Sequence, residues 1–170
     1  QETMDKLQAK KIIKEADPHD FVSNSLVVIV PQTSKNNLTQ LSQLLNDSYQ
    51  RVAIGIPASV PVGRYTKSVL EKNNLWKAME RKMIASQNVR QVLDYVARGE
   101  VDAGFVYATD AVILADKVKV VLKVPTDKKI LYPIAAIANG SNYDEAKQWV
   151  AFIQSPRGQE ILSRYGFGKP

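Results

Sequence analysis

Short apolar runs alternate with helix-like segments along this sequence, and that alternation constrains the fold more than any other feature. Residues 26–30 and 103–107 form runs with the length and apolar content of buried strands. Between such runs, apolar residues recur at helical spacing, as at residues 89–98, where Gly99 follows in the position of a C-terminal cap. Strands that alternate with helices predict an α/β fold with mainly parallel strand pairing.

The same reasoning places the other elements along the chain. Further strands are expected at residues 52–56, 82–85, 118–124 and 132–138, and further helices at residues 1–16, 38–46, 64–72, 109–115, 143–153 and 156–165. Lysines alternate around the strand at 118–124, at Lys117, Lys119 and Lys123. Charged residues in this pattern are typical of a strand near the edge of a sheet.

The composition excludes several classes of site. The 170 residues are 45% apolar and 24% charged, an ordinary globular balance, and no apolar run reaches the 18 residues of a membrane span. The absence of cysteine excludes a disulfide frame, a zinc-thiolate site and a cysteine nucleophile, and a single histidine, His19, argues against a catalytic metal site. We expect His19 to be a loop residue that faces water. The chain opens without the pattern of a signal peptide, which an exported protein would have lost.

Neither nucleic-acid binding nor catalysis is indicated. The net charge is +6, but the cations are scattered among acids and lack interleaved aromatic residues, so we interpret them as a solvated surface. The nucleophile elbow, the dinucleotide fingerprint and the phosphate loop are all absent from the sequence. We therefore expect a protein that is not an enzyme.

Two loop-to-helix junctions and one tyrosine are the candidate binding features. Pro57 and Pro61 stiffen a loop that leads into one helix start, and Ser86 to Asn88 precede another. A helix N-terminus carries unpaired N–H groups and partial positive charge, which favours anions. Both junctions follow strands, and Tyr107 ends a third, so all three could meet at the sheet edge where ligands bind in α/β folds. On these residues alone, ordinary capping by Ser86 or Asn88 and core packing of Tyr107 remain alternatives.

Several strings of the sequence are similar to a known family, the bacterial extracytoplasmic molybdate-binding receptors of ABC importers. The resemblance runs through the whole chain in order, at residues 24–31, 53–57, 60–67, 88–90, 96–100, 104–111, 132–135, 155–156 and 164–167. It implies a two-lobed periplasmic-binding-protein fold of type II, with a complete lobe 2 and a partial lobe 1. Residues 1–31 would form part of lobe 1 and the first crossover strand, residues 32–131 lobe 2, and residues 132–170 the second crossover and the C-terminal helices. The apolar runs 25–31 and 132–138 would then lie side by side as the hinge.

The resemblance also implies a site for a small oxyanion. Carried over, the backbone N–H groups of Val62 and Val89 and the Tyr107 hydroxyl hold molybdate through its oxygens, without direct ligation of the metal. The family commonly has alanine where Val62 stands, and the backbone contact should survive that difference. Its two serine ligands have no counterpart in the chain, because the segments that carry them lie upstream of Gln1. Arg64 and Arg90 would be solvated first-turn residues.

The implied function is capture of molybdate, and of tungstate, outside the cytoplasmic membrane. The implied partners are the oxyanion and the membrane permease of the importer, with no cofactor and no nucleic acid. Two alternatives stay open: a receptor for sulfate or another small oxyanion on the same fold, and the ligand-sensing domain of a transcription regulator, which would need a helix-turn-helix upstream.

Overall fold

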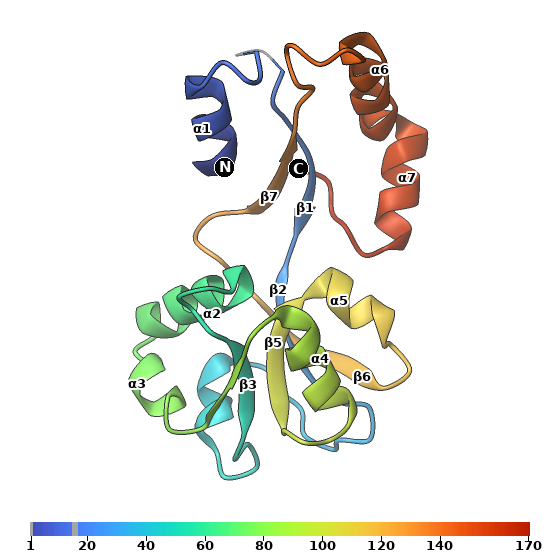
Figure 1. Ribbon diagram of the computed structural model, residues 1–170. Helices are drawn as coiled ribbons and strands as arrows, with labels where there is room; N and C mark the ends of the chain where they lie inside the picture. Colours follow the sequence, from blue (N-terminus) through green and yellow to red (C-terminus); the bar gives the residue numbers. More distant parts are fainter. Residues whose placement is uncertain (1, 15–16) are drawn as a thin grey trace. The chain divides into compact units, whose positions relative to one another are not determined.

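A computed structural model describes residues 2–14 and 17–170 (Figure 1). Contacts within the chain divide it into two compact units. Unit 1 comprises Gln1–Asn24 and Lys129–Pro170, and unit 2 comprises Ser25–Lys128. Unit 2 thus begins at Ser25 and ends at Lys128, whereas residues 32–131 are the range predicted for lobe 2.

Unit 2 is built around a five-stranded sheet. Its strands are β2 (Leu26–Pro31), β3 (Val52–Gly55), β4 (Met83–Ser86), β5 (Ala103–Tyr107) and β6 (Val118–Val124), in the order β4-β3-β5-β2-β6. β6 lies at an edge, which confirms the expectation from its alternating lysines. β2 lies inside the sheet, and every residue from Leu26 to Val30 is buried, as its continuous apolar run predicts.

Strand direction in unit 2 differs from the expected, mainly parallel pattern. β3 pairs in parallel with β4 and with β5, whereas β2 runs antiparallel to both β5 and β6. β5 and β6 are therefore parallel to each other but not adjacent in the sheet. β2 lies between them and runs in the opposite direction. Alternation of strands and helices does not reveal such an inserted strand, because β2 is followed by a long loop and not by a βαβ helix.

Five helical segments complete unit 2. They are the 3-10 helix η1 (Leu41–Leu45), α2 (Pro61–Lys72), α3 (Trp76–Met79), α4 (Val89–Ala97) and α5 (Ala108–Ile113). The sequence predicts a longer α-helix at residues 38–46, where only the 3-10 turn forms. α4 is the clearest amphipathic helix: Val92, Leu93 and Val96 are buried in a cluster with Ala53 and Val106 of the sheet. Its end is capped as expected, with Gly99 at a φ of 68°.

The described residues of unit 1 form a two-stranded antiparallel ribbon and three helices. The ribbon pairs β1 (His19–Asn24) with β7 (Ile130–Ile134), and the helices are α1 (Glu2–Ala9), α6 (Tyr143–Gln154) and α7 (Pro156–Arg164). The first helix, predicted over residues 1–16, ends at Ala9, and residues 1, 15 and 16 lie outside the described residues. Lys11 takes a left-handed φ of 56°, and Ile13 leaves the helical path to form a β-bridge with Ile137.

The expected pairing of the two crossover runs is wrong. The run at 25–31 belongs to the sheet of unit 2, and the strand that pairs with β7 is β1, with Val22 opposite Tyr132 and Asn24 opposite Ile130. The sequence does not reveal this pairing because Val22 is the one fully buried residue of β1, so the ribbon strand has no apolar run to mark it. His19 begins β1 and is exposed, so it faces water from a strand and not from a loop.

Candidate functional site

Three neighbouring strands of unit 2 end at the same edge of the sheet. Parallel pairing sets Gly55 beside Ser86 and Ala53 beside Gly104, so β4, β3 and β5 run in one direction, and β5 continues to Tyr107. The chain leaves β3 towards α2 and leaves β4 towards α4. The carboxyl edge of the three strands therefore carries two helix starts and one tyrosine, which is where α/β folds bind ligands.

Close packing of two glycines fixes the start of α2 on the end of β3. A Cβ on Gly55 would lie 2.7 Å from Cγ1 of Val60, and a Cβ on Gly63 would overlap the Gly55 carbonyl oxygen. Val60 is the N-cap residue and Pro61 the first residue of the helix, which loses nothing by lacking an N–H there. The loop and the first turn can lie directly on the strand because neither glycine has a side chain.

Val62 lies in this first turn, and its side chain is buried. The first backbone bond of the turn runs from the Arg64 N–H to the Val60 carbonyl at 3.2 Å. The N–H of Val62 precedes that bond, so the helix offers it no acceptor. Thr66 donates its hydroxyl to the Val62 carbonyl at 2.8 Å, so that carbonyl has a partner. The N–H groups of Val62 and Gly63 both lie at the open end of the turn.

The start of α4 is held by side-chain caps. Asn88 Oδ1 accepts from the Gln91 N–H at 2.9 Å, and Gln91 Oε1 accepts from the Gln87 N–H at 2.7 Å. The first intrahelical bond runs from Val92 N–H to the Asn88 carbonyl, so the N–H of Val89 precedes it. Asn88 is thus the N-cap, and Ser86, the other candidate, does not cap the helix.

Tyr107 is half-buried at the end of β5, and its surroundings are aromatic and acidic. Its ring meets the ring of Tyr65 on α2 edge to face, with centroids 6.5 Å apart. Its N–H donates to Asp110 Oδ2 at 3.1 Å. The ring contact ties the end of β5 to the first turns of α2, so Tyr107 packs at the predicted edge.

The charges around this edge are few and mostly solvated. Arg64 and Arg90 are exposed, as expected for solvated first-turn residues. Burial raises the pKa of the Asp110 carboxyl above its ordinary value, while the hydrogen bond from Tyr107 N–H and the positive charge of Arg90 act against that shift. The two arginines of this edge are therefore solvated, and the Asp110 carboxyl is engaged by the Tyr107 N–H.

The burial of Ser86 at this edge could not be predicted from the sequence. The residue ends β4, is fully buried, and its hydroxyl has no hydrogen-bond partner among the residues that the structure describes. The sequence suggests only a helix cap. Its actual position depends on the register with Gly55, which nothing in the local sequence indicates.

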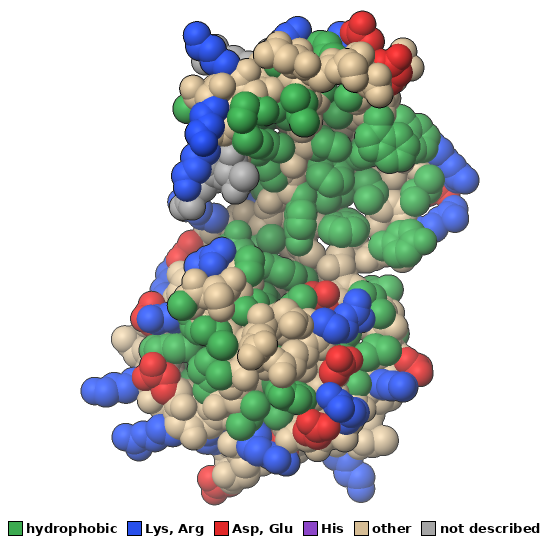
Figure 2. Space-filling view, in the orientation of Figure 1, with side chains coloured by type: hydrophobic (Ala, Val, Ile, Leu, Met, Phe, Trp, Pro, Cys, Tyr) green, Lys and Arg blue, Asp and Glu red, His purple; other side chains and the backbone are tan. Residues whose placement is uncertain are grey.

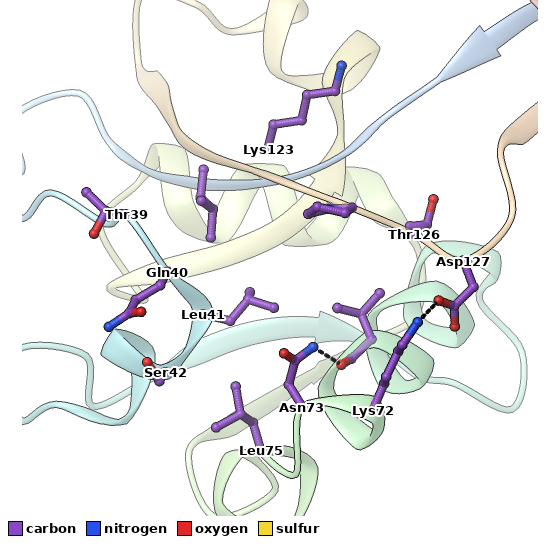
Figure 3. A pocket seen from close by; sticks show the side chains of 13 residues that line it. Thr39, Gln40, Leu41, Ser42, Lys72, Asn73, Leu75, Lys123, Thr126 and Asp127 are labelled. Atoms are coloured by element: carbon purple, nitrogen blue, oxygen red, sulfur yellow. Dashed lines mark hydrogen bonds and ion pairs between the residues drawn. The ribbon is translucent and has the colours of Figure 1, made fainter.

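A separate hollow of about 430 Å³ lies elsewhere in unit 2 (Figure 3). It is lined by residues around η1, the end of α2 and the end of β6, and none of the three predicted site residues is among them. Lys72 and Asp127 form an ion pair at its rim, and the amino group of Lys123 points away from the other labelled side chains (Figure 3). The lysines that line the hollow are thus either paired with an acid or directed outward, so they do not form a binding site for a single anion.

Metal-binding clusters and membrane spans are both absent from residues 2–14 and 17–170. No group of three or more His, Asp or Glu side chains in these ranges is arranged to hold a metal ion. No helix in this part of the chain has the length and apolar character needed to cross a membrane.

The fold and the edge described above define a class of proteins, the α/β solute-binding proteins. A structure from Azotobacter vinelandii, a periplasmic molybdate-binding protein, superposes with a TM-score of 0.77 over 99% of this chain and 75% of its own, at 18% identity. A substrate-binding domain from Clostridium difficile, assigned to a molybdenum ABC transporter, gives a TM-score of 0.90 over 100% of this chain and 74% of its own, at 34% identity. The chain belongs to the family of bacterial extracellular solute-binding proteins, which matches residues 1–168.

Curated relatives agree with this assignment. The molybdate-binding protein ModA of Escherichia coli is 37% identical over 98% of this chain, and that of Haemophilus influenzae is 33% identical over 86%. The chain spans 66% and 59% of the lengths of these two relatives.

Proposed function

We propose that this chain binds molybdate, and also tungstate, as the receptor part of an ABC importer outside the cytoplasmic membrane. The donors are the Val62 N–H, the Val89 N–H and the Tyr107 hydroxyl, and a membrane permease receives the anion. The observation that carries the proposal is the convergence of two helix starts and the end of β5 on one edge of β4, β3 and β5. The names of the curated relatives, which are molybdate-binding proteins, support the choice of ligand.

Neutral donors suit a fully deprotonated oxyanion. Molybdate, tungstate and sulfate are full dianions at neutral pH and accept hydrogen bonds at every oxygen. Hydrogen phosphate carries an O–H that would face donors only, at a cost of roughly 1–3 kcal/mol. Neutral donors also avoid the desolvation of a buried lysine or arginine. Such a site selects its ligand by protonation state and size.

Titration by NMR tests the proposal at the level of single N–H groups. The amide signals of Val62 and Val89 in the labelled chain should move as millimolar molybdate is added, because a hydrogen bond to an anion deshields the amide proton. The Gln91 amide is the internal control: Asn88 already accepts its hydrogen bond, so its signal should move less. Movement elsewhere with no change at Val62 and Val89 would place the anion at another site.

The tyrosine is tested by removing only its hydroxyl. Tyr107→Phe keeps the ring against Tyr65 and should weaken molybdate binding roughly tenfold, the ratio that corresponds to the loss of one charge-assisted hydrogen bond. Tyr165→Phe is the matched control, since Tyr165 is an exposed residue of unit 1. Equal affinities of the two variants for molybdate would show that the Tyr107 hydroxyl does not bind the anion.

Titration of the unsubstituted chain with sulfate under the same conditions tests the sulfate alternative, which requires sulfate to bind at least as tightly as molybdate.

A further inference from the structure

Ser86 presents a buried hydroxyl that the fold itself does not use. The residue is 0% exposed, and Oγ finds no hydrogen-bond partner in the described part of the chain. A buried polar group without a partner destabilises the folded protein, because folding removes its hydrogen bonds to water and no hydrogen bond within the protein replaces them. Apart from Ser86, Tyr49 is the residue whose buried side-chain oxygen is likewise unpaired among the described residues. Such a group calls for an explanation, and a role in binding a ligand is one of the ordinary ones.

Strand register places the Ser86 side chain on the same face of the sheet as Gly55. Ser86 pairs in parallel with Gly55, and its carbonyl accepts from the Ile56 N–H at 2.9 Å. Paired residues on neighbouring strands direct their side chains to the same face of a sheet. On that face, a Cβ at Gly55 would lie 2.7 Å from Cγ1 of Val60 and 3.3 Å from Cγ1 of Val62.

The alternation along β4 gives the same face independently. Ile84, two residues before Ser86, packs against the core cluster that α4 forms with the sheet, as does Val89 at the start of α4. Ser86 must share that face with Ile84, because side chains two apart on a strand point the same way. Its side chain therefore points to the face on which the first turn of α2 lies against Gly55 and on which α4 packs.

We propose that the Ser86 hydroxyl is a further donor to the oxyanion, in addition to Val62, Val89 and Tyr107. The inference rests on the proposed function and extends it by one residue. A hydroxyl rotates freely about its C–O bond, so Ser86 can aim its proton at an anion held by the two neighbouring N–H groups. The unpaired hydroxyl then gains its partner when the anion binds, and part of the cost of its burial is recovered at that moment.

The inference predicts opposite effects of one substitution on stability and on binding. Ser86→Ala removes the unpaired hydroxyl and adds no volume, so the anion-free chain should unfold at the same or a higher temperature. The same change should weaken molybdate binding by roughly tenfold to a hundredfold, the loss expected for one charge-assisted hydrogen bond. A residue with a purely structural role would lower the unfolding temperature of the anion-free chain.

Tyr49→Phe is the matched control. The Tyr49 hydroxyl is also buried and unpaired, and Tyr49 is 2% exposed, but it precedes β3 and so lies at the amino end of the sheet, away from the carboxyl edge. This variant should share the stability effect of Ser86→Ala and bind molybdate as the unsubstituted chain does.

NMR titration of the three chains with molybdate and thermal unfolding without it decide between the outcomes. Weaker binding by Ser86→Ala alone, with an unchanged or raised unfolding temperature, is the expected result. Equal binding by all three chains, with Val62 and Val89 still shifting, would overturn the role of Ser86 and leave the proposed function standing. If the unsubstituted chain shows no response at Val62 and Val89, the proposed function fails and the inference fails with it. A lower unfolding temperature for Ser86→Ala would make Ser86 a structural residue and also overturn the inference.

Discussion

The ring of Tyr107 meets the ring of Tyr65 edge to face, with centroids 6.5 Å apart and planes inclined at 72°. Tyr107 ends β5, and Tyr65 lies in the second turn of α2, so the pair joins the strand to the helix whose start carries Val62. The position of the Tyr107 hydroxyl therefore depends on a residue that needs no contact with the anion.

A double-mutant cycle measures this dependence. Tyr65→Ala and Tyr107→Ala should each lower the free energy of unfolding, and their effects should differ from additivity by about 0.5–1.5 kcal/mol, the usual strength of an edge-to-face pair. Chemical denaturation of the four chains gives the coupling. Tyr65→Phe keeps the ring and should retain both stability and anion affinity. Additive effects of the two alanine substitutions would show that the rings do not support one another.

Gly63 should tolerate no side chain. A methyl group at this position would overlap the carbonyl oxygen of Gly55, which is backbone and cannot move aside. We expect Gly63→Ala to cost about 1–3 kcal/mol of folding free energy, as overpacking does, and to displace the first turn of α2 with its Val62 N–H. Chemical denaturation measures the cost, and the NMR titration measures the loss of the Val62 response.

Gly99→Ala provides the contrast for Gly63. A Cβ at Gly99 meets nothing within 4 Å, and the strain comes only from its φ of 68°. The expected cost is about 1 kcal/mol, with anion binding unchanged. If Gly99→Ala impaired binding as much as Gly63→Ala, general destabilisation would explain both variants. The close approach of α2 to β3 would then not be needed to explain the loss of binding.

Asp110 should make stability depend on pH. Its pKa in the folded protein is raised by burial, so the folded state holds the proton more tightly than the unfolded chain does. The stabilising contribution is complete below the unfolded pKa of about 3.9 and is lost as the pH rises through the higher, folded value. Asp110→Asn, which can still accept from the Tyr107 N–H, should lack this loss.

Thermal unfolding of both chains across the acidic range checks the sign. The unfolding temperature of Asp110→Asn minus that of the unsubstituted chain should increase as the pH rises from about 4 towards neutrality. A difference that changes in the opposite direction over the same range would mean that Arg90 and the hydrogen bond from Tyr107 outweigh the burial of the carboxyl.

Local patterns are enough to predict much of unit 2 from the sequence. The run at 26–30 is apolar because both faces of β2 are buried, and Gly99 follows α4 because the cap needs a left-handed residue. The edge that carries Val62, Val89 and Tyr107 follows from the rule that parallel strands end together. These features are local, or depend only on strand direction.

Features set by register and by long-range pairing could not be predicted. β1 has one fully buried residue, Val22, because a two-stranded ribbon covers little of its surface, so no apolar run marks it as the partner of β7. The insertion of β2 between β5 and β6 leaves no trace in the order of elements. Ser86 resembles a helix cap in the sequence, because its burial depends on lying beside Gly55, a residue distant in sequence.

The 170-residue chain should bind molybdate only weakly. The edge offers the N–H groups of Val62 and Val89 and the hydroxyls of Tyr107 and Ser86 to an anion with four oxygens, each able to accept more than one bond. Oxygens of the anion that these four donors do not reach are expected to bind water, whose high dielectric constant weakens the remaining bonds. We expect a dissociation constant of roughly 1 mM or weaker, equivalent to about 4 kcal/mol. Calorimetry that found tight, stoichiometric binding by a monomer would mean that the donors have been misplaced.

Unit 1 should cause the chain to self-associate. α6 has no buried residue, yet Trp149 and Phe152 on it are 60% and 42% exposed and stack with ring centroids 5.5 Å apart. Figure 2 shows apolar side chains gathered broadly over unit 1. Contiguous apolar surface of this kind favours association, because burying it against a second surface releases water.

Sedimentation of three chains over a range of concentrations tests this origin of association. The unsubstituted chain should form dimers or larger species as its concentration rises, and a Trp149→Ser, Phe152→Ser chain should remain monomeric to higher concentration. Val120→Ser is the matched control, because Val120 is an apolar residue of unit 2 that is 48% exposed, on the edge strand β6. Removing it should leave association unchanged if the α6 surface is responsible. An effect of Val120→Ser as large as that of the double substitution would instead assign the contact to the edge of the sheet, where an exposed strand can pair with a second copy.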